Sequence, residues 1–272
     1  MKAVQGIAIA FCLLIFGGLA TAQISLVQNF PDGEMDWATY DITCNGAGTY
    51  DKNLMPSQFQ LSAINAARDD ASQKIFIVIK DLRFNSQMTV NEYLQQYPPI
   101  ANLLGEYLHE NKIVGRPRLM PDSTVELKVQ YPLLGDPLNA LLPESGSMLN
   151  QAAYDSLIDE QLFFTGLVVD CRGIGLVYAL CPRILAEAGG EVYSIDWADR
   201  EYAADYGVVE YASSDSDISE RVGANPMKII AEGPAVPGLC DVTISIGDAE
   251  RLNSLREKPV IFGQCRVVFL IN

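Results

Sequence analysis

The stretch SQFQLSAINAARDDASQKIFIVI, residues 57–79, decides the fold of the first part of this chain. Its apolar side chains recur at steps of three and four residues, the spacing of one face of an α-helix. Several of these positions hold alanine, and such small side chains let a helix lie close to a sheet or to another helix. Ser57 is suited to cap the helix, while Asp69, Asp70 and Lys74 fall on its polar side. The stretch therefore predicts a long helix packed on another element.

Strand patterns lie on both sides of this helix. Residues 35–43 mix apolar and polar side chains as a strand does, and the glycines of residues 46–48 predict a turn after it. Further along, residues 112–120 and 124–131 have strand patterns, and the Pro-Asp-Ser sequence at 121–123 is typical of a tight turn. The second pair of strands is therefore predicted to form a β-hairpin.

Two shorter helices are expected between the long helix and the hairpin. Thr89 and Glu92 have the spacing of a capping box, which predicts a helix from there to about residue 96. Residues 100–109 have a second amphipathic pattern. Residues 24–135 are thus predicted to form one α+β domain, with helices on one face of an antiparallel sheet.

Residues 136–163 contain prolines and glycines that interrupt regular structure, and we interpret them as a packed linker. The leucines in this segment are too apolar for a solvated tether, so we expect them to contact a partner protein. Aromatic side chains of the first domain are expected to extend that contact. The predicted interaction surface consists of Leu138, Leu141, Leu142, Tyr93 and Tyr97.

A second domain is predicted over residues 164–272, beginning with a buried strand at 165–170. Its clearest pattern comes last, where a strand over 241–246, a helix over 249–256 and a strand over 266–271 predict a β-α-β unit. The fold class predicted for the whole chain is α+β (α/β), with two domains and helices packed on one face of small mixed or antiparallel sheets.

The chain begins with the pattern of a secretory signal peptide. Lys2 is followed by an apolar run over residues 7–19 and by the small residues Ala-Thr-Ala at 20–22. The apolar run has 13 residues, fewer than the ~20 that a helix needs to cross a bilayer. We therefore predict cleavage after Ala22, no transmembrane span in the mature protein, and a periplasmic or outer-membrane-associated location.

The composition is acidic. The formal net charge of the 272-residue chain is −15, and loss of Lys2 with the signal peptide would make it −16 (−15 − 1). Such a charge repels the phosphate backbone of nucleic acids and anionic lipid headgroups. Nucleic acid is therefore not an expected partner.

Five cysteines follow the predicted cleavage site, and their odd number leaves at least one without an intramolecular partner. Cys171 and Cys181 would form a disulfide if they faced each other across a strand–turn–strand. Buried free thiols are expected instead for Cys240 and Cys265. No C-x-x-C spacing occurs, so neither a redox nor a zinc motif is indicated.

One string resembles a reactive site. Asp170 ends a predicted buried strand and is followed by Arg172, Gly173 and Gly175, a position at which α/β enzymes place nucleophiles and phosphate loops. A dinucleotide fingerprint would need a third glycine and a helix directly after it. The two interpretations left open are a tight turn stabilised by Asp170 or Arg172, and an anion or metal site.

The sequence offers few other catalytic groups. His109 is the single histidine, and its place near the end of a predicted helix favours a structural role. No G-x-S-x-G motif is present. We therefore predict no catalytic residues, no cofactor and no metal ligands.

The first domain resembles a known family in its order of elements. The alanine-rich helix of residues 63–71 is followed by the Met-Thr-Val-Asn-Glu-Tyr sequence at 88–93 and by the hairpin sequence at 119–127. In these features residues 35–135 are similar to the LPP-type antigen lipoproteins and to the N-terminal domain of flagellar assembly protein T. The resemblance implies a structural protein of the periplasm or outer membrane, and in the flagellar case a component of basal-body assembly.

These observations predict a non-catalytic cell-envelope protein that acts through protein–protein contacts. Its expected partners are other envelope proteins, including basal-body components in the flagellar case. The alternative is a secreted metal-dependent hydrolase or metal-binding protein centred on Asp170.

Overall fold

A computed structural model describes residues 26–51, 53, 55–143, 163–215, 218–236, 239–255 and 257–272. The predicted signal peptide, its cleavage site and residues 144–162 of the predicted linker lie outside these ranges. The protein has an α+β fold, as the sequence predicted. We call residues 26–143 the N-terminal half and residues 163–272 the C-terminal half. None of the helices in the described ranges combines the length and hydropathy that a membrane-spanning helix needs.

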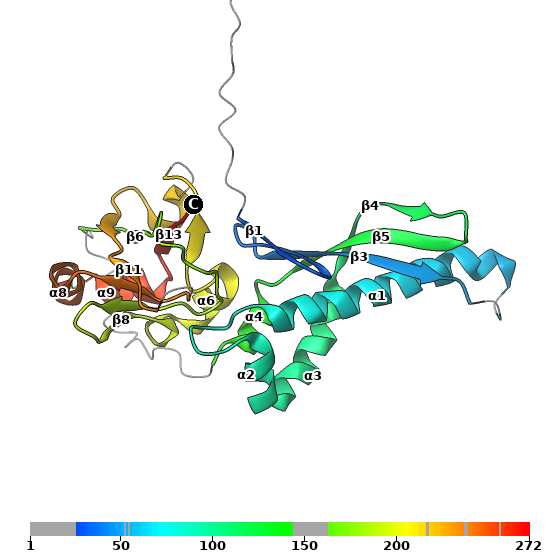
Figure 1. The fold of residues 1–272 in the computed structure, drawn as a ribbon, viewed down its shortest axis with the longest axis horizontal. Helices are drawn as coiled ribbons and strands as arrows, with labels where there is room; N and C mark the ends of the chain where they lie inside the picture. Colours follow the sequence, from blue (N-terminus) through cyan, green and yellow to red (C-terminus); the bar gives the residue numbers. More distant parts are fainter. Residues whose placement is uncertain are drawn as a thin grey trace, which may run out of the picture.

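The N-terminal half contains a five-stranded sheet in which every neighbouring pair is antiparallel. In spatial order its strands are β1 (Val27–Phe30), β2 (Gly33–Asp36), β3 (Asp41–Thr49), β5 (Thr124–Pro132) and β4 (Lys112–Leu119). The predicted hairpin is confirmed, because β4 and β5 pair across a turn in which Ser123 has a φ of 69°. Figure 1 shows this sheet as an elongated layer with one long helix lying along it.

That helix is α1 (Phe59–Asp81), which the sequence predicted, and it follows the short 3-10 helix η1 (Pro56–Gln58). Its buried side chains include Ala63, Ala67 and Ala71, which pack on β3. The turn predicted over residues 46–48 is wrong, since those residues lie within β3. A Cβ atom on Gly46 would lie 1.9 Å from the carbonyl oxygen of Ala67. The glycines are thus needed for the close contact between strand and helix.

Shorter helices complete the N-terminal half: α2 (Val90–Gln96), α3 (Pro98–Tyr107), the 3-10 helix η2 (Leu108–Glu110) and α4 (Asp136–Leu141). The predicted capping box at the start of α2 is confirmed. Thr89 accepts a hydrogen bond from the Glu92 backbone, and the Glu92 side chain accepts one from the Thr89 backbone at 2.7 Å. These contacts satisfy N–H groups that have no partner within the helix.

The C-terminal half contains two four-stranded sheets. The first is parallel, in the order β10 (Met227–Ile230), β6 (Leu167–Asp170), β13 (Val267–Leu270) and β9 (Glu210–Ala212). The second is mixed, in the order β11 (Gly233–Pro234), β12 (Val242–Ile244), β7 (Ile184–Ala186) and β8 (Glu191–Tyr193).

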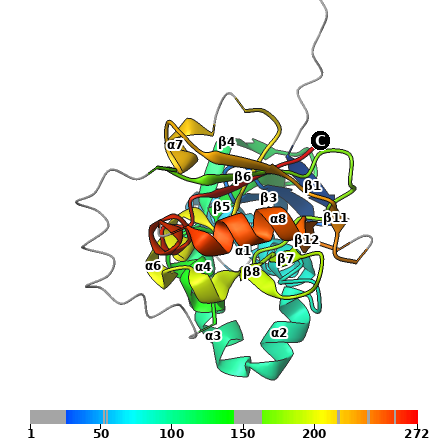
Figure 2. The same ribbon diagram turned by 90° about the vertical axis from the view of Figure 1, so that its left-hand side faces the viewer.

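The helices of this half are short, and several of them pack beside these sheets. They are the 3-10 helix η3 (Ile195–Trp197), α6 (Arg200–Tyr206), α7 (Ser219–Val222), α8 (Ile246–Ser254) and α9 (Lys258–Gly263). Figures 1 and 2 show α8 on the outer side of this half, away from the N-terminal half.

The β-α-β unit predicted for the end of the chain is wrong. Its two strands, β12 and β13, belong to different sheets, because β12 pairs with β7 and β13 pairs with β6 and β9. Two helices, α8 and α9, connect them. The apolar side chains of the two predicted strands are buried all the same: Val242, Ile244, Val267, Val268 and Leu270. Burial follows from apolar character alone, whereas strand pairing depends on distant residues.

A cluster of aromatic side chains joins the two halves. Trp37 stacks on Tyr178 with ring centroids 5.3 Å apart and meets the edge of Tyr211 at 5.6 Å. Tyr40 donates a hydrogen bond of 2.9 Å to the carbonyl oxygen of Val209. We call Trp37, Tyr40, Tyr178 and Tyr211 the aromatic joint. One continuous apolar core runs through the joint and includes side chains from both halves.

The start of the predicted linker is part of this core. Leu138, Leu141 and Leu142 are all buried, so the prediction that they form an interaction surface is wrong. They lie on or next to α4, which packs between α3 and α6. Arg200 of α6 donates hydrogen bonds of 2.7 Å to both the side chain and the backbone oxygen of Asn139. Helix α4 therefore helps to hold the halves together.

Candidate functional site

Asp170 lies at the carboxyl end of β6, the sheet edge at which parallel α/β proteins place their ligands. Its carboxylate accepts hydrogen bonds from the backbone N–H and from the guanidinium of Arg172. The Arg172 side chain is also the main reason that the pKa of Asp170 lies below its usual value. Both carboxylate oxygens are therefore bound within the turn that Asp170 itself begins.

The glycines of the same string shape the backbone of this turn. Gly173 and Gly175 have φ values of +79° and +68°, in the left-handed region that favours glycine. The N–H of Gly173 donates a hydrogen bond of 2.7 Å to the side chain of Asn272. These contacts agree with the tight-turn interpretation of the string. Among the described residues, no three His, Cys, Asp or Glu side chains come together as metal ligands would.

The cysteines do not form the disulfide considered for Cys171 and Cys181. All five described cysteines are free and buried. The segment between Cys171 and Ile184 contains no strand, so the strand–turn–strand that would bring the two thiols together does not form. The backbone N–H of Cys181 instead donates to the carbonyl oxygen of Phe84 in the N-terminal half, at 2.8 Å. Burial raises the pKa of the Cys240 and Cys265 thiols to about 11, which keeps them protonated at neutral pH.

The aromatic part of the predicted interaction surface is only partly exposed. Tyr93 is buried and stacks on Phe84 with ring centroids 4.3 Å apart, so its predicted role on a surface is wrong. Tyr97 is exposed over 50% of its surface. The helical pattern of residues 90–96 did not show that Tyr93 is buried, because its packing partner, Phe84, lies outside that helix.

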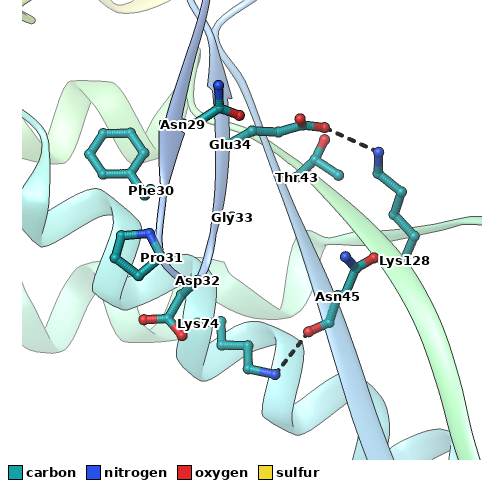
Figure 3. Close-up of a pocket in the computed structure, with 10 residues that line it drawn as sticks. All are labelled: Asn29, Phe30, Pro31, Asp32, Gly33, Glu34, Thr43, Asn45, Lys74 and Lys128. Atoms are coloured by element: carbon teal, nitrogen blue, oxygen red, sulfur yellow. Dashed lines mark hydrogen bonds and ion pairs between the residues drawn. The ribbon is translucent and has the colours of Figure 1, made fainter.

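The structure contains a groove that the sequence did not suggest. A hollow of about 420 Å³ lies beside the β1–β2 hairpin and over the adjoining strands, and Figure 3 shows the side chains that line it. A second hollow of about 410 Å³ lies next to it and shares Asn45, Lys74 and Lys128 with it. We call the two together the groove. Its charged lining residues are Asp32, Glu34, Lys74, Arg116, Arg118, Glu126 and Lys128.

The groove lies on the part of the sheet that the helices leave open. Along β3 and β5, buried side chains alternate with more exposed ones, and the buried set faces α1. Thr43, Glu126 and Lys128 belong to the other set. Every residue of β4 is exposed, so the sheet ends there in an uncovered strand. The groove is therefore accessible from solvent along its length.

Two side chains of α1 close the strand edge beneath the groove. Pairing of β3 with β2 ends at Cys44, which leaves the following backbone groups of β3 without a strand partner on that side. Lys74 donates a hydrogen bond of 3.0 Å to the carbonyl oxygen of Asn45, and Asp70 accepts one of 2.9 Å from the N–H of Ala47. Lys74 and Asp70 also form an ion pair at 2.8 Å. This arrangement blocks the addition of another strand at this edge.

The cations of the groove differ in how they are paired. Lys128 forms an ion pair with Glu34 at 3.1 Å, which Figure 3 shows. Arg116 and Arg118 form no ion pair with any residue in the described ranges. The lining has four cations and three anions, on a chain whose net charge is −15. The sequence signal for this feature is the Arg-Pro-Arg at 116–118, which stands out only against the acidic composition.

Together these features define an α+β protein with two halves on one core, an open sheet face and a groove lined by two arginines that have no ion-pair partner among the described residues. Residues 166–272, which form nearly all of the C-terminal half, match the family model of the second domain of Treponema pallidum Tp0624. This half is thus similar to that domain. A search of curated proteins finds no match for the chain.

Proposed function

We propose that this chain is an exported, non-catalytic scaffold protein of the cell envelope that binds an acidic segment of another envelope protein in the groove. The observation that carries the proposal is that Arg116 and Arg118 form no ion pair within the described ranges, in a groove on an otherwise acidic protein. Opposite charges across an interface steer association and select the partner. An acidic segment would be attracted to the groove and repelled by most of the remaining surface.

The continuous core supports a scaffold role. Because the aromatic joint and α4 connect the halves through buried contacts, the groove stays at a fixed position relative to the C-terminal half. A rigid pair of surfaces can hold two partners at a defined separation. The resemblance of residues 35–135 to LPP-type antigen lipoproteins and to the N-terminal domain of flagellar assembly protein T supports an envelope setting, and basal-body assembly is the narrower form of this proposal.

Export is proposed from the signal-peptide pattern of residues 1–22. The test is to express the tagged full chain and a variant lacking residues 2–22 and then to fractionate the cells. We expect the full chain in the envelope or periplasmic fraction with Gln23 as its first residue, and the truncated chain in the cytoplasm. An unprocessed full chain in the cytoplasm would contradict this part of the proposal.

The groove is tested by photocrosslinking in living cells, with a photoreactive amino acid at Val114. This side chain lines the groove and is 42% exposed. The control position is Val236, which is 52% exposed in the C-terminal half. We expect a defined crosslinked protein from position 114 only, and a loss of about tenfold in its yield when Arg116 and Arg118 are both changed to Glu.

A matched charge reversal sharpens this test. Arg251 is an exposed arginine on α8, far from the groove, and Arg251→Glu should leave the crosslink unchanged. Identical crosslinking with and without the groove arginines would contradict the proposal, as would a partner whose crosslinked segment carries no excess of acidic residues.

The alternative of a metal-dependent hydrolase centred on Asp170 makes a different prediction. A metal ion would have to displace Arg172 from the Asp170 carboxylate. Thermal melting with and without Ca²⁺, Mg²⁺ or Mn²⁺ distinguishes the two functions. The scaffold proposal expects the same Tm in each case. A rise of several degrees that Asp170→Asn abolishes would favour the hydrolase.

A further inference from the structure

A separate cavity of about 330 Å³ lies in the C-terminal half, away from the groove. It is formed where α6 and α7 meet the β9–β13 side of the parallel sheet. The volume falls in the range of small-molecule sites, which begins at about 300 Å³. Its lining residues are Tyr202, Tyr206, Glu210, Glu220, Arg221, Gln264 and Arg266.

Arg221 is committed to the fold. Its guanidinium donates hydrogen bonds to three backbone carbonyl oxygens, those of Tyr206, Gly207 and Cys265. These bonds tie α7 to the end of α6 and to the start of β13. Most of the hydrogen-bonding capacity of this side chain is therefore used by the protein itself.

Glu210 and Arg266 are not committed in this way. No described residue forms a hydrogen bond with the Glu210 carboxylate, and partial burial raises the pKa of that group, although the nearby charge of Arg221 opposes the shift. Among the described residues, the guanidinium of Arg266 donates a single bond of 3.3 Å, from Nη1 to the carbonyl oxygen of Thr165. Each of the two charges thus retains bonding capacity toward the cavity.

The strand register places these two charges on the same face of the sheet. Glu210 lies beside Val268 in the parallel β9–β13 pair. Arg266 directly precedes β13, and its carbonyl oxygen accepts a hydrogen bond of 2.8 Å from the Leu167 N–H, which continues the pairing with β6. Residues two apart in such extended backbone point to the same face, so Arg266 and Val268 share a face. Yet no ion pair joins Glu210 to Arg266, so their charged groups are more than 4.0 Å apart. Two opposite charges therefore line one cavity without forming an ion pair across it.

The tyrosines supply an apolar wall. Tyr202 and Tyr206 lie one turn apart on α6, with ring centroids 6.2 Å apart and ring planes inclined by 24°. Such a pair offers a surface on which an aliphatic or aromatic side chain can pack.

From this arrangement we propose that the cavity binds a free amino acid. The ammonium group of the ligand pairs with Glu210, its carboxylate pairs with Arg266, and its side chain packs on Tyr202 and Tyr206. A simple anion would leave the half-buried carboxylate of Glu210 without a hydrogen-bond partner, and a simple amine would leave the guanidinium of Arg266 without an anion. A zwitterion satisfies both and keeps the cavity neutral.

The first test is isothermal titration of the mature protein with L-phenylalanine, L-leucine and L-lysine. We expect at least one of them to bind. The strongest ligand is then compared with the amine that lacks its carboxylate and with the acid that lacks its ammonium group. For phenylalanine these are 2-phenylethylamine and 3-phenylpropanoate. Each analogue is expected to bind at least about tenfold more weakly than the amino acid, which is the usual effect of losing a hydrogen bond to a charged group.

Two variants assign the charges. Glu210→Gln should weaken binding of the amino acid about tenfold but leave the affinity for 3-phenylpropanoate unchanged. Arg266→Gln should also weaken binding of the amino acid about tenfold, but it should leave the affinity for 2-phenylethylamine unchanged. Glu250→Gln and Arg251→Gln, on the exposed side of α8, are the matched controls and should have no effect. Circular dichroism establishes that each variant is folded.

The outcomes that overturn the proposal are distinct. They are absence of binding by all three amino acids, binding that folded Glu210→Gln and Arg266→Gln proteins retain in full, and equally tight binding by a single-charge analogue. None of these bears on the groove, which lies in the other half of the molecule.

Discussion

The two halves of this protein bury their sheets in different ways. In the N-terminal half, the long strands β3 and β5 alternate buried and more exposed side chains, because only one face of the sheet is covered. In the C-terminal half, every residue of β13 and three of the four residues of β6 are buried. Antiparallel sheets can leave one face to water, whereas parallel sheets are covered on both. The first half leaves an open sheet face that carries the groove, and the second leaves a hollow where α6 and α7 meet its parallel sheet.

Among the substitutions that test this comparison, Trp37→Ala should have the largest effect on stability, because it removes the centre of the aromatic joint. Loss of a buried tryptophan costs about 3–5 kcal/mol of unfolding free energy. Because the joint connects the halves, we also expect thermal unfolding to separate into two transitions. Trp197→Ala is the control, since Trp197 is 37% exposed and lies outside the joint. A single, merely shifted transition in Trp37→Ala would show that other contacts suffice to couple the halves.

The next effect concerns the close packing of the N-terminal half. Gly46→Val places its Cβ against the backbone of α1, where the nearest atom is 1.9 Å away, and should cost about 3 kcal/mol or prevent folding. Ala47→Val, the neighbouring residue on the exposed side of the same strand, should change stability by less than about 0.5 kcal/mol. Urea denaturation of both variants measures the difference. Equal stabilities of the two variants would mean that α1 and β3 can move apart without a loss of unfolding free energy.

A smaller effect is expected at the strand edge that α1 closes. Burial would raise the pKa of Asp70, but the ion pair with Lys74 and the Ala47 N–H together hold it below the usual value. Asp70→Ala should cost about 1 kcal/mol at neutral pH, a modest figure because the pair is partly exposed.

The pH dependence of this effect has a definite sign. The stabilisation by Asp70 is present above its unfolded pKa of about 3.9 and is lost as the pH falls through the lower folded value. The stabilities of wild type and Asp70→Ala should therefore converge in acid. A difference that grows in acid would contradict the assignment.

The smallest expected effect on stability is at Glu210, and its pH dependence has the opposite sign to that of Asp70. Burial raises the folded pKa of Glu210 above the unfolded value of about 4.3. Ionisation of Glu210 thus destabilises the folded protein progressively as the pH rises between the two values. Glu210→Gln, in the absence of ligand, should have a higher Tm than wild type at neutral pH and the same Tm below about pH 4. A lower Tm at neutral pH would mean that the carboxylate has a stabilising partner within the protein.

Sequence patterns predicted much of the N-terminal half because its structure is determined locally. The helix α1, the capping box of α2 and the β4–β5 hairpin each depend on residues close in the chain. The glycines of β3 were misinterpreted because their need arises from contact with Ala67 of α1, which follows Gly46 by 21 residues (67 − 46) and Gly48 by 19 (67 − 48). In the C-terminal half, the sequence located β6, β12 and β13, but the assignment of strands to two sheets depends on long-range pairing.

The candidate sites were the least predictable from sequence. Asp170, Arg172 and the two glycines do lie together, but as a turn that satisfies its own charges. The groove and the cavity beside α6 are assembled from several separate segments. The Arg-Pro-Arg at 116–118 is the one short sequence signal of the groove, and its meaning depends on residues far away in the chain. Leu138, Leu141 and Leu142 were expected at a surface because the pattern showed their apolar character and not their partner, α6.

The central claim is that the two halves share one core and act as a rigid body. Differential scanning calorimetry of a chain of residues 23–272 is the decisive test. A rigid body with one core should show a single transition in which the calorimetric and van't Hoff enthalpies agree. Two resolved transitions, or a calorimetric enthalpy well above the van't Hoff value, would show that the halves unfold independently and would contradict the claim.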